Sequence, residues 1–335
     1  MLAILIAISV IAVILQTGIG AKVGSYGVDT VNLTFVDIDR CSTYPQCNLG
    51  LEYQLRFGRR INVAVYAPRN KMNQSALIIF AYEYPDQVAI LSNAISSSGI
   101  IVAAFPVYDL NHRLDIARDL LFVAKELTYE NVSPTSPLWN TIATSQLCLM
   151  GQGLASTAPI LSSSQELLQY NNQVNVSAII SLSPTMQNGL GLQEAAFYSI
   201  SPALVFGASN DCVHPTLLNA VPAYNAIRRT PRTCKTYVEI LNATSCSVTD
   251  AYQTSCLSDE IACGTRTMIS ATKQRSIIAS LIASWVAGVV GKQAIESSNF
   301  VNQLRLQTSN TLAYLQSCPS LNSSHIMSLS RAKNI

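Results

Sequence analysis

The chain has 335 residues, enough for one large domain with a substantial hydrophobic core. Lysine plus arginine total 21 and aspartate plus glutamate total 19, and the formal charge of +2 lacks the clustered basic residues of a nucleic-acid-binding protein. Charged residues make up only 12% of the chain, about half of the ~25% usual in soluble domains, so the surface needs another route to solubility or is partly covered in an assembly.

The chain begins with an uninterrupted apolar run, Leu2–Leu15, which is too short for a comfortable membrane span. Gly18-Ile19-Gly20 then offers the small residues that signal peptidase needs at its cleavage site. Residues 1–20 are therefore predicted to be a signal peptide, and the mature protein is expected to be secreted and extracellular, with no stable membrane span. Because no lysine or arginine precedes the run, an uncleaved membrane anchor stays open as an alternative.

Apolar, β-rich segments then alternate with longer helix-like stretches, which favours βαβ units and a mostly parallel central sheet with helices on both faces. The expected strands are Asn62–Tyr66, Ala76–Ala81, Ile100–Phe105, Ser145–Met150, Ala178–Leu182, Ala203–Gly207 and, as the last, Thr236–Ile240. The expected helices are Val88–Ser98, Leu114–Leu127, Leu154–Leu168 and Gln274–Val290. The predicted fold class is therefore α/β, with one domain over residues 21–291 and a C-terminal extension over residues 292–335. Within that extension the stretch Phe300–Leu315 is amphipathic.

The expected strand Ser145–Met150 runs straight into the turn Gly151-Gln152-Gly153-Leu154-Ala155. Strand, sharp turn and helix in this order define a nucleophile elbow. Two later strands end in loops that contain Asp211 and Ser245, respectively. On these motifs the chain resembles secreted α/β-hydrolases of the dienelactone-hydrolase, platelet-activating-factor acetylhydrolase and polyester-hydrolase group, over roughly residues 64–290.

The resemblance implies an α/β-hydrolase fold whose reactive residues are missing. The family's serine place, in the motif G-x-S-x-G, is Gly153, its acid place is Asp211, and its histidine place is Ser245. The oxyanion strand, which usually ends in His-Gly, here ends in Ala81-Tyr82-Glu83. Glycine supplies no nucleophilic oxygen, and a serine hydroxyl cannot shuttle a proton near neutral pH as imidazole does. The chain is therefore predicted to be a pseudoenzyme, with no cofactor and no metal site.

Two residues are candidates to replace the missing groups. Ser156 lies about one turn beyond Gly153 and is expected to point elsewhere, whereas His214 follows Asp211 closely and can swing toward the old pocket. The competing interpretation is a surface or capping role. The loss of the histidine does not depend on the alignment at Ser245, because no histidine lies between His214 and His325.

Nine cysteines fit an oxidising compartment, and their odd number leaves at least one without an intramolecular partner. Cys41 and Cys47 are close enough to close a small loop, as are Cys256 and Cys263, and Cys148 lies in an apolar segment typical of a buried free thiol. The resemblance to the polyester-hydrolase group implies a further Cys212–Cys246 bridge. Cys234 is an alternative partner for either of these two.

Six Asn-x-Ser/Thr sequons support secretion, because attached glycans would compensate for the missing surface charge. The acceptor residues are Asn32, Asn73, Asn131, Asn175, Asn242 and Asn322. The predicted function is a non-catalytic extracellular glycoprotein, structural or self-assembling, whose partners are further copies or other extracellular proteins. A ligand-binding module that uses the old hydrolase pocket and an active esterase with relocated residues are the alternatives. The stretch Phe300–Leu315 either docks on a neighbouring subunit or packs on its own domain.

Overall fold

The structure is a computed structural model. It describes residues 24–41, 58–71, 73–83, 88–108, 113–164, 167–168, 174–185, 196, 199, 201–228, 234–250, 268–291, 299–304 and 312–317. The predicted signal peptide, the sequon at Asn322 and two of the three histidines, His112 and His325, lie outside these residues.

The centre of the molecule is a nine-stranded sheet with the order β1-β2-β4-β3-β5-β6-β7-β8-β9. Its strands are β1 (Val28–Cys41), β2 (Gly58–Pro68), β3 (Ser75–Glu83), β4 (Ile101–Val107), β5 (Ile142–Gln152), β6 (Val176–Leu182), β7 (Ala203–Ala208), β8 (Lys235–Ile240) and β9 (Leu312–Ser317). The strands from β4 to β8 are paired in parallel, whereas β1, β2 and β9 are joined by antiparallel pairing. The predicted α/β class with a mostly parallel sheet is confirmed.

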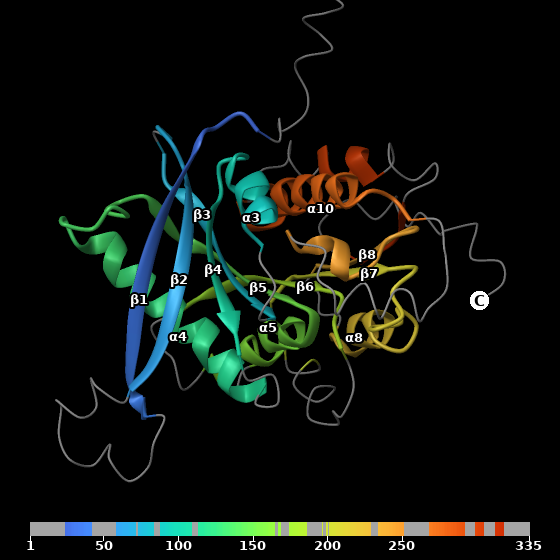
Figure 1. The fold of residues 1–335 in the computed structure, drawn as a ribbon, viewed down its shortest axis with the longest axis horizontal. Coiled ribbons are helices and arrows are strands. Elements are labelled where there is room, and N and C mark those ends of the chain that lie inside the picture. Colours follow the sequence, from blue (N-terminus) through green and yellow to red (C-terminus); the bar gives the residue numbers. More distant parts are fainter. Residues whose placement is uncertain are drawn as a thin grey trace, which may run out of the picture.

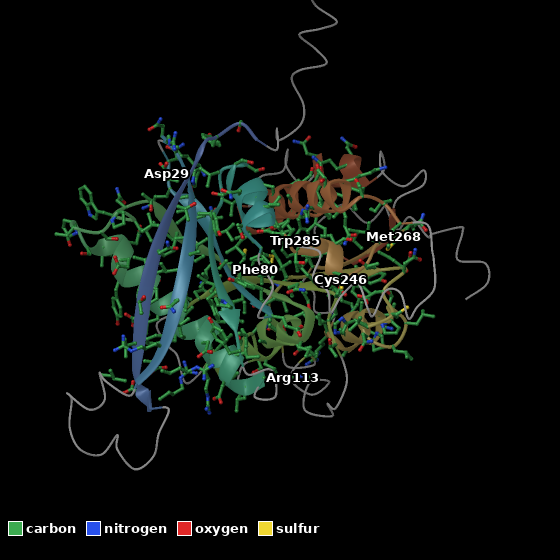
Figure 2. All side chains as sticks on the ribbon, viewed as in Figure 1. Asp29, Phe80, Arg113, Cys246, Met268 and Trp285 are labelled. Carbon is green, nitrogen blue, oxygen red and sulfur yellow. The ribbon has the colours of Figure 1, made fainter. Side chains whose placement is uncertain are left out.

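Helices cover both faces of the sheet, as the apolar sequences of its central strands require. One face packs against α3 (Ala89–Ser96) and α10 (Ala271–Trp285), and the other against α4 (Arg113–Val132), α5 (Ala158–Ser162) and α8 (Ala220–Ala226) (Figure 1). Alternate residues of β3 point to opposite faces, so that Ile79 packs on the α4 side and Phe80 on the α10 side. Phe80 and Trp285 both lie in the interior and are fully buried (Figure 2).

All seven expected strands are present, and the expected helices are found with different bounds. The helix expected over Leu154–Leu168 is shorter, because the chain first makes a 3-10 turn, η2 (Gly153–Thr157), and α5 then ends at Ser162. The last helix is α10, which continues as a π-helical turn, η4 (Val286–Val290). The elements β1, β9 and α8 were not predicted. Among the described residues no helix is both long and apolar enough to cross a membrane.

The C-terminal residues correct one expectation and decide between two alternatives. Strand β9 is paired antiparallel with β8, so Thr236–Ile240 is not the last strand, and part of the predicted extension belongs to the main sheet. Phe300 and Leu304, from a short helix over residues 299–304, are buried in the same core as α10. This part of the amphipathic stretch therefore packs on its own domain and does not offer an apolar stripe to a neighbouring subunit.

Candidate functional site

The turn after β5 has the geometry of an elbow. Gly153 has a φ of +62°, in the left-handed region that glycine adopts without a steric penalty. Gly151 is also required, because a Cβ at this position would lie 2.3 Å from the backbone oxygen of Ala155. The sequence therefore folds here into the strand, sharp turn and helix that the motif predicted.

The side chain of Glu83, at the end of β3, fills the space beside the elbow where a nucleophile would stand. A Cβ at Gly153 would lie 2.7 Å from Glu83 Oε2. The backbone N–H of Leu154 donates to the same oxygen across 3.4 Å. In an elbow, the N–H of the residue after the nucleophile is one of the two oxyanion-hole donors. The carboxylate of Glu83 therefore stands against Gly153 and accepts from the first backbone N–H after it.

Asp211 lies just beyond the end of β7 and is buried. Its Oδ1 accepts a hydrogen bond of 2.8 Å from the backbone N–H of His214, which holds the loop in a tight turn. Its Oδ2 has no hydrogen-bond partner among the described residues, and His214 Nδ1 stands 3.9 Å away, beyond hydrogen-bonding distance. The retained acid thus has a buried oxygen of the kind that orients imidazole in a triad.

Ser245, at the histidine place, is buried at the start of the short 3-10 helix η3 (Cys246–Val248). The residue before it, Thr244, is fixed at both backbone atoms by Gln274 of α10, whose side chain accepts from its N–H and donates to its carbonyl. The backbone N–H of Asn210 donates to the carbonyl of Ala243 across 2.9 Å. The loops after β7 and β8 therefore converge, as predicted, and residue 245 itself is a serine.

Ser156 has a structural role. Its hydroxyl donates to the carbonyl of Gly153 across 2.5 Å, and its side chain is fully buried. It therefore points back to the elbow's own backbone, as expected. Sequence reasoning missed two other buried hydroxyls near the site, Thr157 and Thr185, whose Oγ1 atoms have no hydrogen-bond partner among the described residues.

Four further cysteines lie in the described part of the chain beyond β1. Cys212, Cys234 and Cys246 each form a disulfide bond. Cys148 is a free thiol, as predicted, and its complete burial raises its pKa to about 12. The predicted pairing of Cys212 with Cys246 stays a prediction, as do the small loops, because Cys47, Cys256 and Cys263 lie outside the described residues.

Five of the six sequons lie in the described part of the chain, and four of these have exposed asparagines, Asn32, Asn73, Asn175 and Asn242. Asn131, at the end of α4, is different because it is buried. Its side-chain nitrogen donates to the carbonyl of Ile142 across 3.2 Å, and its side-chain oxygen accepts from the N–H of the same residue across 2.8 Å. Burial leaves less room for a glycan at Asn131 than at the four exposed asparagines, and glycosylation of all five stays a prediction.

Glycopeptide mass spectrometry is expected to find Asn131 unmodified, while the exposed acceptors carry glycans. Replacing Asn131 with alanine should lower the free energy of unfolding by about 1–3 kcal/mol, because it leaves two buried backbone groups of β5 without partners. Urea unfolding measures this change, and the exposed Asn175→Ala is the matched control. A glycan on Asn131 in the folded protein, or equal stability of the two variants, would contradict the assignment.

Within the described ranges no group of three or more histidine, cysteine, aspartate or glutamate side chains is placed to hold a metal ion. Comparison with known protein families finds no family model that matches the chain, and a search of curated proteins finds no match either. The function of the chain therefore has to be inferred from the geometry of its own site.

Proposed function

We propose that this chain is a secreted, glycosylated pseudoenzyme with an α/β-hydrolase fold. The single observation that supports this most strongly is the carboxylate of Glu83, which stands against Gly153 and accepts from the backbone N–H of Leu154. The order of the elements agrees with the fold, because an elbow follows β5, an acid follows β7, and the loop after β8 lies beside the acid loop.

Three separate changes stop acyl transfer at this site. Position 153 has no side chain to attack a carbonyl, and position 245 has no imidazole to accept the proton. Loss of triad members typically lowers turnover on the order of 10⁴–10⁶-fold. The third change is Glu83, because a carboxylate only accepts hydrogen bonds and cannot stabilise a second negative oxygen in the same place.

The role that we propose is a structural or self-assembling extracellular subunit. Exposed apolar residues that gather on one surface often mark an interface. Tyr129 and Val132 lie one turn apart at the end of α4, and Trp139 lies in the turn whose next residue, Asn140, donates its N–H to the carbonyl of Asn131. The exposed fractions of Tyr129, Val132 and Trp139 are 49%, 67% and 56%. This apolar surface suits contact with a second copy or another extracellular protein.

The purified native glycoprotein is expected to give no covalent adduct with a fluorophosphonate probe and no hydrolysis of p-nitrophenyl acetate above the buffer rate. It is also expected to sediment as a species larger than one chain. Labelling of the native protein at any serine, confirmed by loss after substitution of that serine, would overturn the first part of the proposal. A monodisperse single chain at physiological concentration would overturn the second part.

Ligand binding is a second candidate, because two buried polar atoms lack partners near the old triad. Asp211 Oδ2 follows β7 and Thr185 Oγ1 follows the neighbouring strand β6, and neither has a hydrogen-bond partner among the described residues. Buried polar atoms normally have a partner, so a small polar molecule with a donor group would suit them. Saturable stabilisation of the native protein by such a molecule, lost in Asp211→Ala, would favour this function over a purely structural one.

A further inference from the structure

Strand β9 places one more cysteine beside Cys234. The antiparallel register of β8 and β9 runs from Ile240 opposite Leu312 to Lys235 opposite Ser317. Partners in an antiparallel pair advance in opposite directions along the chain. The next position of this register on β8 is Cys234, and the residue that follows Ser317 in the sequence is a cysteine, Cys318. Cys318 itself lies just outside the described residues, but the chain reaches it in a single step from Ser317.

The described cysteines near the site do not suit Cys234 as partners. Cys234 lies just before the amino end of β8. Cys246 and Cys212 lie beyond the carboxyl ends of β8 and β7, respectively. The two ends of a six-residue strand are about 20 Å apart. This is far beyond the ~4.4–6.8 Å between the Cα atoms of a disulfide. The alternative in which Cys234 bonds to Cys212 or Cys246 is therefore inconsistent with the sheet.

Two further cysteines lie in described strands away from Cys234. Cys148 is free, and Cys41 ends β1, which is seven strand spacings of ~4.8 Å from β8. Cys47, Cys256 and Cys263 lie outside the described residues, so the tryptic peptides have to distinguish them from Cys318. Both described ends of the segment that contains Cys256 and Cys263 are nevertheless held by other elements. At one end Asp250 accepts from the N–H of Ile90, and at the other the N–H of Ile269 donates to the carbonyl of Asn242, beyond the carboxyl end of β8.

We propose that Cys234 and Cys318 form a disulfide that fixes β9 on the edge of the sheet. Residues directly opposite in an antiparallel pair have Cα atoms about 4.5–5.5 Å apart, which is within the range of a disulfide. Without β9, strand β8 would present unpaired backbone groups at the edge of the sheet, and such edges pair with other chains. The bond thus keeps the edge closed, and it stabilises the fold by restricting the unfolded chain over a long loop.

Trypsin separates the relevant cysteines cleanly. Cys234 leaves in the three-residue peptide 233–235, and Cys318 leaves in peptide 306–331. Peptide 126–228 contains Cys148 and Cys212. Peptide 236–266 contains Cys246, Cys256 and Cys263. A bond from Cys234 to Cys318 therefore gives a linked product whose mass differs from that of a bond to any other cysteine.

The native glycoprotein is alkylated with iodoacetamide, deglycosylated and digested without reductant, and its linked peptides are identified by mass spectrometry. Peptide 233–235 is expected to be linked to peptide 306–331. The proposal is overturned if peptide 233–235 is linked to any other peptide or carries the alkyl group. This experiment needs no folded variant, and its result is independent of whether the chain has catalytic activity.

The substitution Cys318→Ser tests the consequence for the sheet edge. It should release Cys234 to alkylation and shift the protein toward larger species in sedimentation, because the edge of β8 is less securely covered. Cys148→Ser, which removes the buried free thiol, is the matched control and should leave both properties unchanged. The proposal fails if Cys234 keeps the same linkage in the Cys318→Ser chain.

Discussion

Replacing Asp119 with alanine is expected to lower the free energy of unfolding by about 3 kcal/mol, because it removes the shared partner of two arginines. Asp119 lies on α4, and its side chain is only 4% exposed. It accepts hydrogen bonds of 2.8 and 2.6 Å from Nε and Nη2 of Arg59 on β2. Arg40 Nη2, from β1, approaches the same carboxylate at 2.8 Å. The carboxylate therefore ties a helix to the antiparallel end of the sheet.

Equilibrium unfolding in urea with the disulfides intact measures this effect. The matched control is Asp29→Ala, which breaks the pair between Asp29 and Arg69 at the same end of the sheet. Because the side chains of that pair are 53% and 56% exposed, water screens the attraction, and we expect no measurable change in the control. If both variants lost the same free energy of unfolding, the burial of Asp119 would not explain how much it stabilises the fold.

The central strands could be predicted from the sequence because each is a short apolar run buried on both faces, such as ALIIFA in β3. The strand β1 was missed although Val31, Leu33 and Phe35 alternate with polar residues in it. As an edge strand β1 is half exposed, and it depends on its pairing with β2 rather than on local apolar density. The Asp119 cluster was missed for a related reason, because its residues are far apart in the sequence.

At the site, the sequence predicted the strand-to-helix turn after β5, since such a turn can be recognised locally. It did not predict what fills the space beside the turn. Ala81 is paired with Gly151, so Glu83 comes level with Gly153 two residues further along the parallel strands. That contact joins residues 70 positions apart and follows from the register of β3 and β5. The only local signal was a strand that ends in a carboxylate where the family has His-Gly.

Ester hydrolysis is expected to return only when three positions are changed together. Gly153→Ser supplies the nucleophile and Ser245→His supplies the base, while Asp211 keeps a buried oxygen to orient it. With these two substitutions alone activity should stay low, because the flexible end of Glu83 has to shift away from the new Cβ, 2.7 Å from its Oε2, and the carboxylate competes for the N–H of Leu154. Glu83→Ala removes that oxygen and leaves its own Cβ 3.9 Å away, which is an ordinary contact. It also frees the N–H of Leu154 for the oxyanion.

The triple variant G153S/S245H/E83A should hydrolyse p-nitrophenyl acetate with kcat/KM about 10²–10³-fold above the double variant G153S/S245H, the range expected for one oxyanion donor. A fluorophosphonate should form an adduct at position 153 only in the triple variant. The matched control G153A/S245H/E83A has the same opened pocket without a hydroxyl, and it should stay inactive. Circular dichroism and thermal unfolding verify that each variant is folded, because a side chain at φ +62° carries some strain.

The outcomes separate the role of Glu83 from the identity of the site. If the double variant is as active as the triple variant, Glu83 does not block the elbow, and the proposed cause of inactivity is wrong in that part. If the folded triple variant stays unlabelled while Leu154 is free to donate, then the loop at position 245 does not present an imidazole to the elbow. In that case the hydrolase assignment of Ser245 fails. Activity confined to the triple variant would show that the scaffold keeps the triad geometry and that the carboxylate of Glu83 closes it.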